Sequence, residues 1–135
     1  MLNWLKTRLG FTAPQVLIVE DDQASRLVLS MVIKNMRKNI RVTATETVVG
    51  ARELLAREKF SLVIADCLLA NDSNGIDLLR HCQQAYPRLP FILMSGLTQE
   101  TIMGMLPKST APFRFLPKPV DTKTYPPVIA DFLKL

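Results

Sequence analysis

Residues 16–22 read VLIVEDD, an apolar run that ends in three acidic residues. An apolar run of this kind is typical of a strand that is buried on both faces of a parallel sheet. The following stretch, QASRLVLSMVIKNMRK at 23–38, predicts a helix in which Leu27, Met31 and Lys34 recur one turn apart. The first organised unit is therefore a strand followed by a helix, with acidic side chains at the junction.

The same alternation continues along the rest of the chain. Further strands are expected at 41–45, 61–66, 91–95 and 113–119. Further helices are expected at 48–59, 76–85, 99–106 and 126–134, the third of them with Thr98 as its N-cap. Five strands that alternate with five helices predict an α/β fold, a doubly wound five-stranded parallel sheet with helices on both faces.

Length and composition limit the classes of protein that this chain can belong to. Its 135 residues, 48% hydrophobic and 21% charged, suit one folded domain and exclude a two-domain enzyme or a disordered chain. Apolar runs such as 16–19 are far shorter than the roughly 20 residues that span a bilayer. Cys67, Cys82 and His81 have no metal-binding spacing, so a reduced, cytoplasmic protein is expected. The net charge of +5 raises the question of an anionic partner.

The expected strand ends carry the side chains that chemistry would need. Glu20 and Asp21 follow the first strand, Asp66 ends the third, Ser95 ends the fourth and Lys118 lies in the last. Carboxylates that converge repel one another, by about 4 kcal/mol at 4 Å and an effective dielectric of 20, so a cation should offset them. Oxygen ligands favour Mg²⁺, and a metal, a lysine and a carboxylate nucleophile suit phosphoryl transfer.

These motifs, in this order, resemble the receiver domain of two-component response regulators, of the stand-alone chemotaxis or phosphorelay type. The resemblance covers residues 15–135. It rests on VLIVEDD with Arg26 behind it, on LVIAD, on Gly75, on ILMSG and on FRFLPKP. It implies the flavodoxin-like strand order 2-1-3-4-5, an order that receivers of the chemotaxis type share.

The resemblance also implies a role for each strand-end residue. Asp66 would be the phosphoacceptor, and Mg²⁺ would be held by Glu20, Asp21, Asp66 and the backbone carbonyl of Leu68. Lys118 would bind the phosphoryl group. The switch residues would be Ser95 and Phe115, the bond from Lys118 to Pro119 would be cis, and Asp22 would be a helix N-terminal acid.

The function implied is that of a single-domain response regulator. A sensor histidine kinase or a histidine phosphotransfer protein would phosphorylate Asp66, and the phosphorylated protein would act on a downstream protein target. The chain would not be an enzyme beyond its own phosphorylation and slow autodephosphorylation. Leu68 and Leu97 support the slow rate, because they are apolar where fast-cycling members often carry polar groups. Two other functions are less well supported. An aspartate-nucleophile phosphatase would need a second acid at the position of Leu68, and binding to nucleic acid is suggested by the net positive charge alone.

Two departures from the family pattern leave alternatives open. Ala70 stands where receivers usually have proline, and the span from Asp66 to Gly75 is one residue longer than usual. A degenerate receiver that acts as a phosphorylation-independent adaptor is therefore the alternative function, as is the receiver fragment of a longer regulator.

The first 15 residues precede the expected receiver domain at 16–135. Leu2, Leu5 and Leu9 at helical spacing, with Lys6 and Arg8 opposite, predict a short amphipathic helix. Packing on the domain is the preferred interpretation. A homodimer contact, or contact of residues 1–11 with a membrane surface, is the alternative.

Overall fold

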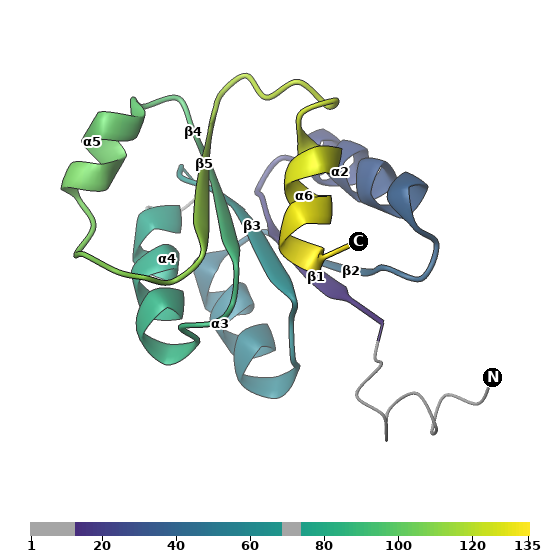
Figure 1. The fold of residues 1–135 in the computed structure, drawn as a ribbon, viewed down its shortest axis with the longest axis horizontal. Helices are drawn as coiled ribbons and strands as arrows, with labels where there is room; N and C mark the ends of the chain where they lie inside the picture. Colours follow the sequence, from purple (N-terminus) through teal and green to yellow (C-terminus); the bar gives the residue numbers. More distant parts are fainter. Residues whose placement is uncertain (1–12, 69–73) are drawn as a thin grey trace.

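The computed structural model describes residues 13–68 and 74–135. Its core is a five-stranded parallel sheet of order β2-β1-β3-β4-β5, which confirms the expected fold and strand order (Figure 1). The strands are β1 (Gln15–Val19), β2 (Arg41–Thr45), β3 (Leu62–Asp66), β4 (Phe91–Ser95) and β5 (Phe113–Pro117).

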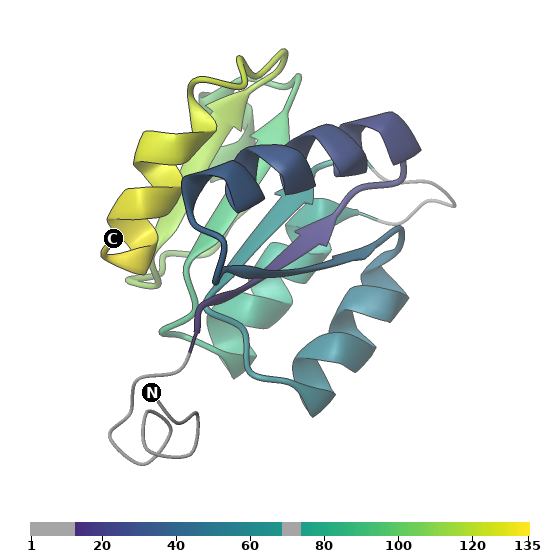
Figure 2. The same cartoon turned by 90° about the vertical axis from the view of Figure 1, so that its right-hand side faces the viewer.

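Five helices in the described residues cover the two faces of the sheet. They are α2 (Gln23–Met36), α3 (Val48–Arg57), α4 (Gly75–Ala85), α5 (Gln99–Gly104) and α6 (Tyr125–Leu133). Helices α2 and α6 pack on one face, and α3 and α4 pack on the other (Figures 1 and 2). Among the residues described, no helix has the length and apolar character needed to cross a membrane.

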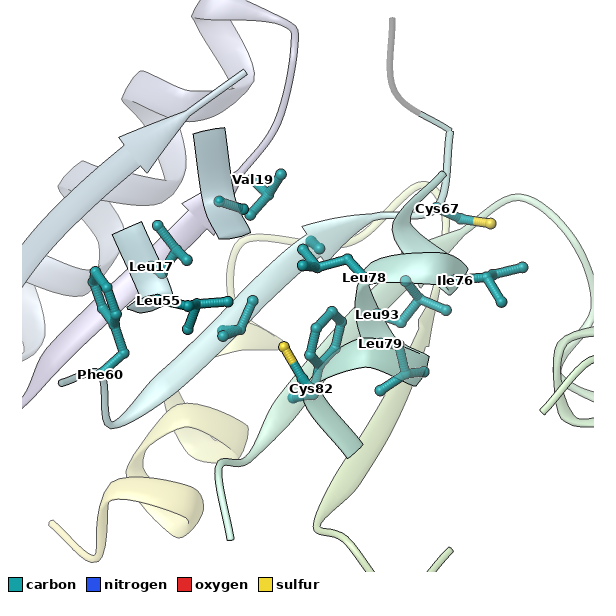
Figure 3. Close-up of a cluster of buried hydrophobic side chains, with 14 of the residues drawn as sticks. Leu17, Val19, Leu55, Phe60, Cys67, Ile76, Leu78, Leu79, Cys82 and Leu93 are labelled. Carbon is teal, nitrogen blue, oxygen red and sulfur yellow. The ribbon is translucent and has the colours of Figure 1, made fainter. Parts of the chain in front are cut away.

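Two hydrophobic cores explain why the central strands are apolar throughout. In β1, Leu17 and Val19 join the core beneath α3 and α4, whereas Val16 and Ile18 join the core beneath α2 and α6. Figure 3 shows the first of these cores, in which Leu17 and Val19 lie with side chains from α3, α4 and β4. Because successive side chains of a strand point to opposite faces, a strand between two helical layers must be apolar at every position.

Local side-chain caps set the starts of four helices. Asp22, Thr47, Asn74 and Thr98 each accept a hydrogen bond from a backbone N–H in the first turn of the helix that follows. The Thr98 cap was expected from the sequence, and Asp22 lies at a helix start as expected. Such caps satisfy N–H groups that have no partner inside the helix.

The structure corrects several details. The buried side of α2 is formed by Leu29 and Ile33, while Leu27 and Met31 are 61% and 57% exposed. The last strand ends at Pro117 and α5 ends at Gly104, both earlier than expected, and β1 begins at Gln15. Of the N-terminal extension at 1–15, in which a short helix was predicted, residues 1–12 lie outside the described residues, as does the departure at Ala70.

Candidate phosphoryl-acceptor site

The acidic residues at the ends of β1 and β3 come together as expected. Glu20, Asp21 and Asp66 each offer a carboxylate oxygen, and these three oxygens lie within 4.8 Å of one another. The cause is the sheet topology, because β1 and β3 are parallel neighbours and so end at the same edge. Glu20 and Asp66 are buried, whereas Asp21 is exposed.

Lys118 provides the positive charge beside this cluster. Its Nζ donates to Oδ2 of Asp66, and its backbone N–H donates to the carbonyl of Ser95 at 2.8 Å. The peptide bond from Lys118 to Pro119 is cis, as the resemblance implied. Burial lowers the pKa of Lys118, but the hydrogen bond and charge of Asp66 outweigh burial, so that the pKa is raised. The lysine therefore stays charged against Asp66.

Glu20 has the most perturbed environment in the cluster. Burial, the hydrogen bond with Asp66 and the negative charge of Asp66 together raise the pKa of Glu20 from 4.5 to about 7. Its Oε2 is buried and has no hydrogen-bond partner. The backbone carbonyl of Glu20 is held by Nη1 of Arg26 at 2.8 Å, and Arg26 also pairs with Glu46 at 3.1 Å.

The donor set fits a hard divalent cation. Three carboxylates face one lysine, Lys118, and one buried carboxylate oxygen lacks a hydrogen-bond partner in the described residues. The cluster therefore carries excess negative charge, which a bound cation would neutralise. Carboxylate oxygens are the ligands that Mg²⁺ takes in proteins. Glu20, Asp21 and Asp66 are the residues that would hold it. The metal role of the Leu68 carbonyl stays a prediction, and the N–H of Leu68 donates to Oδ1 of Asp66 at 3.1 Å.

Ser95 lies at the end of β4, next to Cys67, and carries a hydroxyl that can donate a hydrogen bond. The side chain is 1% exposed, and its Oγ accepts a hydrogen bond from the N–H of Leu97 at 2.9 Å. A hydroxyl that accepts one hydrogen bond still has its own hydrogen to donate. Phe115 is half-buried and packs against the core on the α3 and α4 side, and its switch role stays a prediction.

Gly75 fixes how closely α4 approaches Asp66. Its N–H donates to the carbonyl of Cys67 at 2.9 Å, and a Cβ at this position would lie 2.1 Å from the carbonyl oxygen of Asp66. Only glycine fits this contact. Cys67 itself is buried in the core, and burial raises the pKa of its thiol.

Tyr125 was not found from the sequence, although it lies close to the site. Its hydroxyl donates to Sδ of Met94 at 2.6 Å, and it lines a pocket of about 360 Å³ together with Glu20 and Lys118. Burial, followed by the negative charges of Glu20 and Asp66, raises the pKa of Tyr125 to about 12. No motif marks this residue, because it is brought to the site only by the packing of α6 on α2.

Comparison with known proteins agrees with this architecture. Residues 16–128 match the response regulator receiver domain family. The response regulator protein PilR of Pseudomonas aeruginosa is 34% identical over 122 residues, 90% of this chain and 26% of that protein. The DNA-binding transcriptional regulator NtrC of a Bradyrhizobium species is 31% identical over 112 residues, 82% of this chain and 22% of that protein. The chain thus spans about a quarter of the length of these relatives.

Solved structures show the same fold. A CheY-like receiver domain protein from Methanospirillum hungatei superimposes with a TM-score of 0.79 at 21% identity, over 91% of this chain and 95% of that chain. The HemR receiver domain from Leptospira biflexa, in its non-phosphorylated form, superimposes with a TM-score of 0.74 at 28% identity, over 90% of this chain and 95% of that chain. With its sheet order, its strand-end acids and lysine, and the family match over residues 16–128, the chain belongs to the response regulator receiver family.

Proposed function

We propose that this protein accepts a phosphoryl group on the carboxylate of Asp66 from a histidine kinase or a histidine phosphotransfer protein, in the cytoplasm. The observation that carries the proposal is the position of Asp66. Its carboxylate is 6% exposed at a strand end, bound by Lys118 and placed against Glu20 and Asp21. A carboxylate so placed combines a nucleophile with the charges that phosphoryl transfer needs.

The residues have separate tasks in this transfer. A carboxylate oxygen of Asp66 forms the bond to phosphorus, while the phosphorus–nitrogen bond of the donor phosphohistidine breaks and the imidazole nitrogen leaves with the electron pair. Lys118, whose side chain is 42% exposed, can turn from the carboxylate to the phosphoryl oxygens. Bound Mg²⁺ would supply positive charge against the oxygens of the transferred group. Glu20 and Asp21 supply the carboxylates that attract the metal ion.

Signalling would follow from the hydroxyl of Ser95. This hydroxyl can donate to a phosphoryl oxygen, which would draw the end of β4 toward Asp66 and change the surface near α5 and β5. A ligand that binds one of two conformations more tightly shifts the population toward it. Phe115, half-buried on β5, would turn inward as part of this change. The downstream target would be a protein that distinguishes the two surfaces.

Phosphorylation is tested with acetyl phosphate and Mg²⁺ on the full chain. Intact-mass spectrometry should show a gain of one phosphoryl group in the wild-type protein and in Asp22→Asn, and none in Asp66→Asn. Asp22 is a matched control because it is an adjacent acid that caps α2 and lies outside the carboxylate cluster. Chelation of the metal should remove the gain from the wild-type protein and from Asp22→Asn.

Two outcomes would count against this proposal. If Asp66→Asn were labelled as strongly as the wild-type protein, another residue would be the phosphoacceptor. No labelling by acetyl phosphate or by any phosphohistidine protein would favour the phosphorylation-independent adaptor. A third arrangement, in which this receiver works within a longer regulator, is supported by the short share of PilR and NtrC that the chain covers.

The acyl phosphate should persist for longer than seconds. Leu68 and Leu97 follow Asp66 and Ser95 by two positions. Their side chains have no polar group that could orient an attacking water molecule. The double variant Leu68→Gln/Leu97→Gln should release phosphate severalfold faster than the wild-type protein, as followed by loss of the mass gain. Leu27→Gln, which alters an exposed leucine on α2, is the control. Release within seconds from the wild-type protein would contradict the prediction.

A further inference from the structure

The edge strand β2 has one side to which no strand is paired in the described residues. Among the strands that the structure describes it pairs with β1 alone, and Figure 2 shows it at the front of the molecule between α2 and α3. Its own start, at Arg41, lies at the end of the sheet opposite to Asp66. The start of β2 is therefore separate from the phosphoryl-acceptor site.

The hydrogen bonds to β1 show which backbone groups are left on this open side. Arg41 donates its N–H to the carbonyl of Pro14 at 2.9 Å, and Thr45 accepts at its carbonyl from the N–H of Glu20 at 3.0 Å. In a parallel pair, alternate residues direct both backbone groups to the same neighbour. Val42 and Ala44 therefore direct two N–H donors and two C=O acceptors outward.

Exposed cations surround the start of this open edge. Lys34, Arg37, Lys38 and Arg41 are exposed, and we call these four residues the α2–β2 basic surface. None of the four forms a salt bridge within the described part of the chain. Three of them, Lys34, Lys38 and Arg41, line a groove of about 510 Å³ whose floor includes Val42 of the edge.

The segment that contains these four cations is rich in basic residues. Residues 23–45 contain five basic residues and no acidic residue, which equals the net charge of +5 of the whole chain. The acid that follows β2, Glu46, pairs with Arg26 at 3.1 Å. The four cations of the α2–β2 basic surface are therefore left available to acidic groups of a partner.

We propose that the open edge of β2 binds an extended acidic segment of a partner protein, which adds as a further strand. The backbone of the segment would pair with Val42 and Ala44, and its carboxylates would meet the α2–β2 basic surface. Addition of a strand to an exposed edge is a recurring mode of peptide recognition, in which main-chain hydrogen bonds give affinity and side chains give specificity. Here the specificity comes from charge.

The backbone groups favour a peptide over a nucleic acid. The outward carbonyls of Val42 and Ala44 need N–H donors, which a peptide backbone provides and a phosphodiester backbone does not. Charge also disfavours a second copy of this chain at the same edge. Two β2 edges side by side would bring two α2–β2 basic surfaces together, and like charges repel.

The test measures binding of a fluorescently labelled peptide of alternating glutamate and valine residues to the full chain. Fluorescence anisotropy should show binding that weakens with salt, and amide resonances of Val42 and Ala44 should shift in NMR spectra. A peptide with lysine in place of glutamate should not bind. A peptide of the same charge, with N-methyl groups at alternate residues of the pairing side, should bind at least about fivefold more weakly, as loss of about one hydrogen bond predicts.

Two charge variants separate this surface from general attraction. Lys34→Glu/Lys38→Glu/Arg41→Glu should weaken binding about tenfold or more, as the loss of three surface ion pairs predicts. Arg88→Glu/Lys108→Glu/Lys123→Glu makes the same change in net charge at other exposed positions and should weaken it much less. Circular dichroism verifies that both variants fold, and Ala44→Pro removes an outward N–H with the charge unchanged.

Several results would overturn the proposal. It would fail if the acidic peptide did not bind, or if the two charge variants lost equal affinity for it. It would also fail if the N-methylated peptide bound as tightly as the unmodified one, or if the NMR shifts were confined to amides away from β2. If a duplex DNA probe bound more tightly than the acidic peptide, the surface would be a nucleic-acid site. If the chain formed a dimer that Lys34→Glu/Lys38→Glu/Arg41→Glu dissociated, the surface would bind a second copy of the chain. Asp66→Asn should bind the peptide normally, so failure of this proposal is distinguishable from failure of the phosphorylation proposal.

Discussion

At pH 8 and without divalent cations, the Glu20→Gln variant should be more stable than the wild-type protein by up to about 3 kcal/mol. The reason is that Glu20 is buried and lies against Asp66, which raises its pKa from 4.5 to about 7. Glutamine keeps the shape of the side chain and removes the charge. The neutral amide also removes the repulsion between the carboxylates of Glu20 and Asp66.

The direction of the pH dependence follows from the raised pKa. Below pH 4.5, Glu20 carries a proton in both the folded and the unfolded protein, and its contribution to stability is fully present. Between pH 4.5 and about 7 the unfolded chain loses the proton while the folded protein keeps it. That stability is therefore lost as the pH rises through about 7, so wild type and variant should differ at pH 8 and agree near pH 4.

Urea unfolding at a series of pH values, with and without Mg²⁺, measures this effect. Glu53→Gln removes the same charge from an exposed position on α3 and should change stability by less than about 0.5 kcal/mol. Added Mg²⁺ should stabilise the wild-type protein more than Glu20→Gln, because a ligand of the folded state shifts the unfolding equilibrium. A loss of stability in Glu20→Gln at pH 8 would refute the electrostatic account of the site.

Replacement of Gly75 by alanine should destabilise the protein by about 3 kcal/mol or more. The added Cβ would lie 2.1 Å from the carbonyl oxygen and 2.9 Å from the carbonyl carbon of Asp66, and 3.1 Å from Cα of Cys67. These atoms belong to the backbone at the end of β3, so no side-chain rotation relieves the contact. Either α4 or the strand end must move, and Asp66 would move with it.

The matched control is Gly104→Ala, at the end of α5. A Cβ there meets nothing within 4 Å, and alanine favours a helix over glycine by up to about 1 kcal/mol, so this variant should be as stable as wild type or slightly more stable. Thermal and urea unfolding compare the two variants. Acetyl phosphate should also label Gly75→Ala more slowly than Gly104→Ala. Equal stability of the two variants would show that the close approach of α4 is not required.

Much of the fold could be predicted because its signals are local. Apolar runs such as 91–95 identify central strands, and Thr98 marks the start of a helix by its own hydrogen-bonding chemistry. The side of α2 that packs inward was harder to predict from the sequence. Leu27 and Met31 have the same spacing as a buried stripe, yet Leu29 and Ile33 are the residues that face the sheet. The choice between two apolar stripes depends on contacts with α6 and the sheet.

The sequence by itself determined the alternation of strands and helices and the residue types at the strand ends, because both are patterns of neighbouring residues. Only the tertiary structure decided that Glu20 is buried against Asp66 with an unpartnered oxygen, that Gly75 lies too close to the carbonyl of Asp66 for any Cβ, and that no strand in residues 13–68 and 74–135 pairs with the outer side of β2. Burial, pKa and contact distance are set by segments far apart in the chain, which meet only when the sheet has formed.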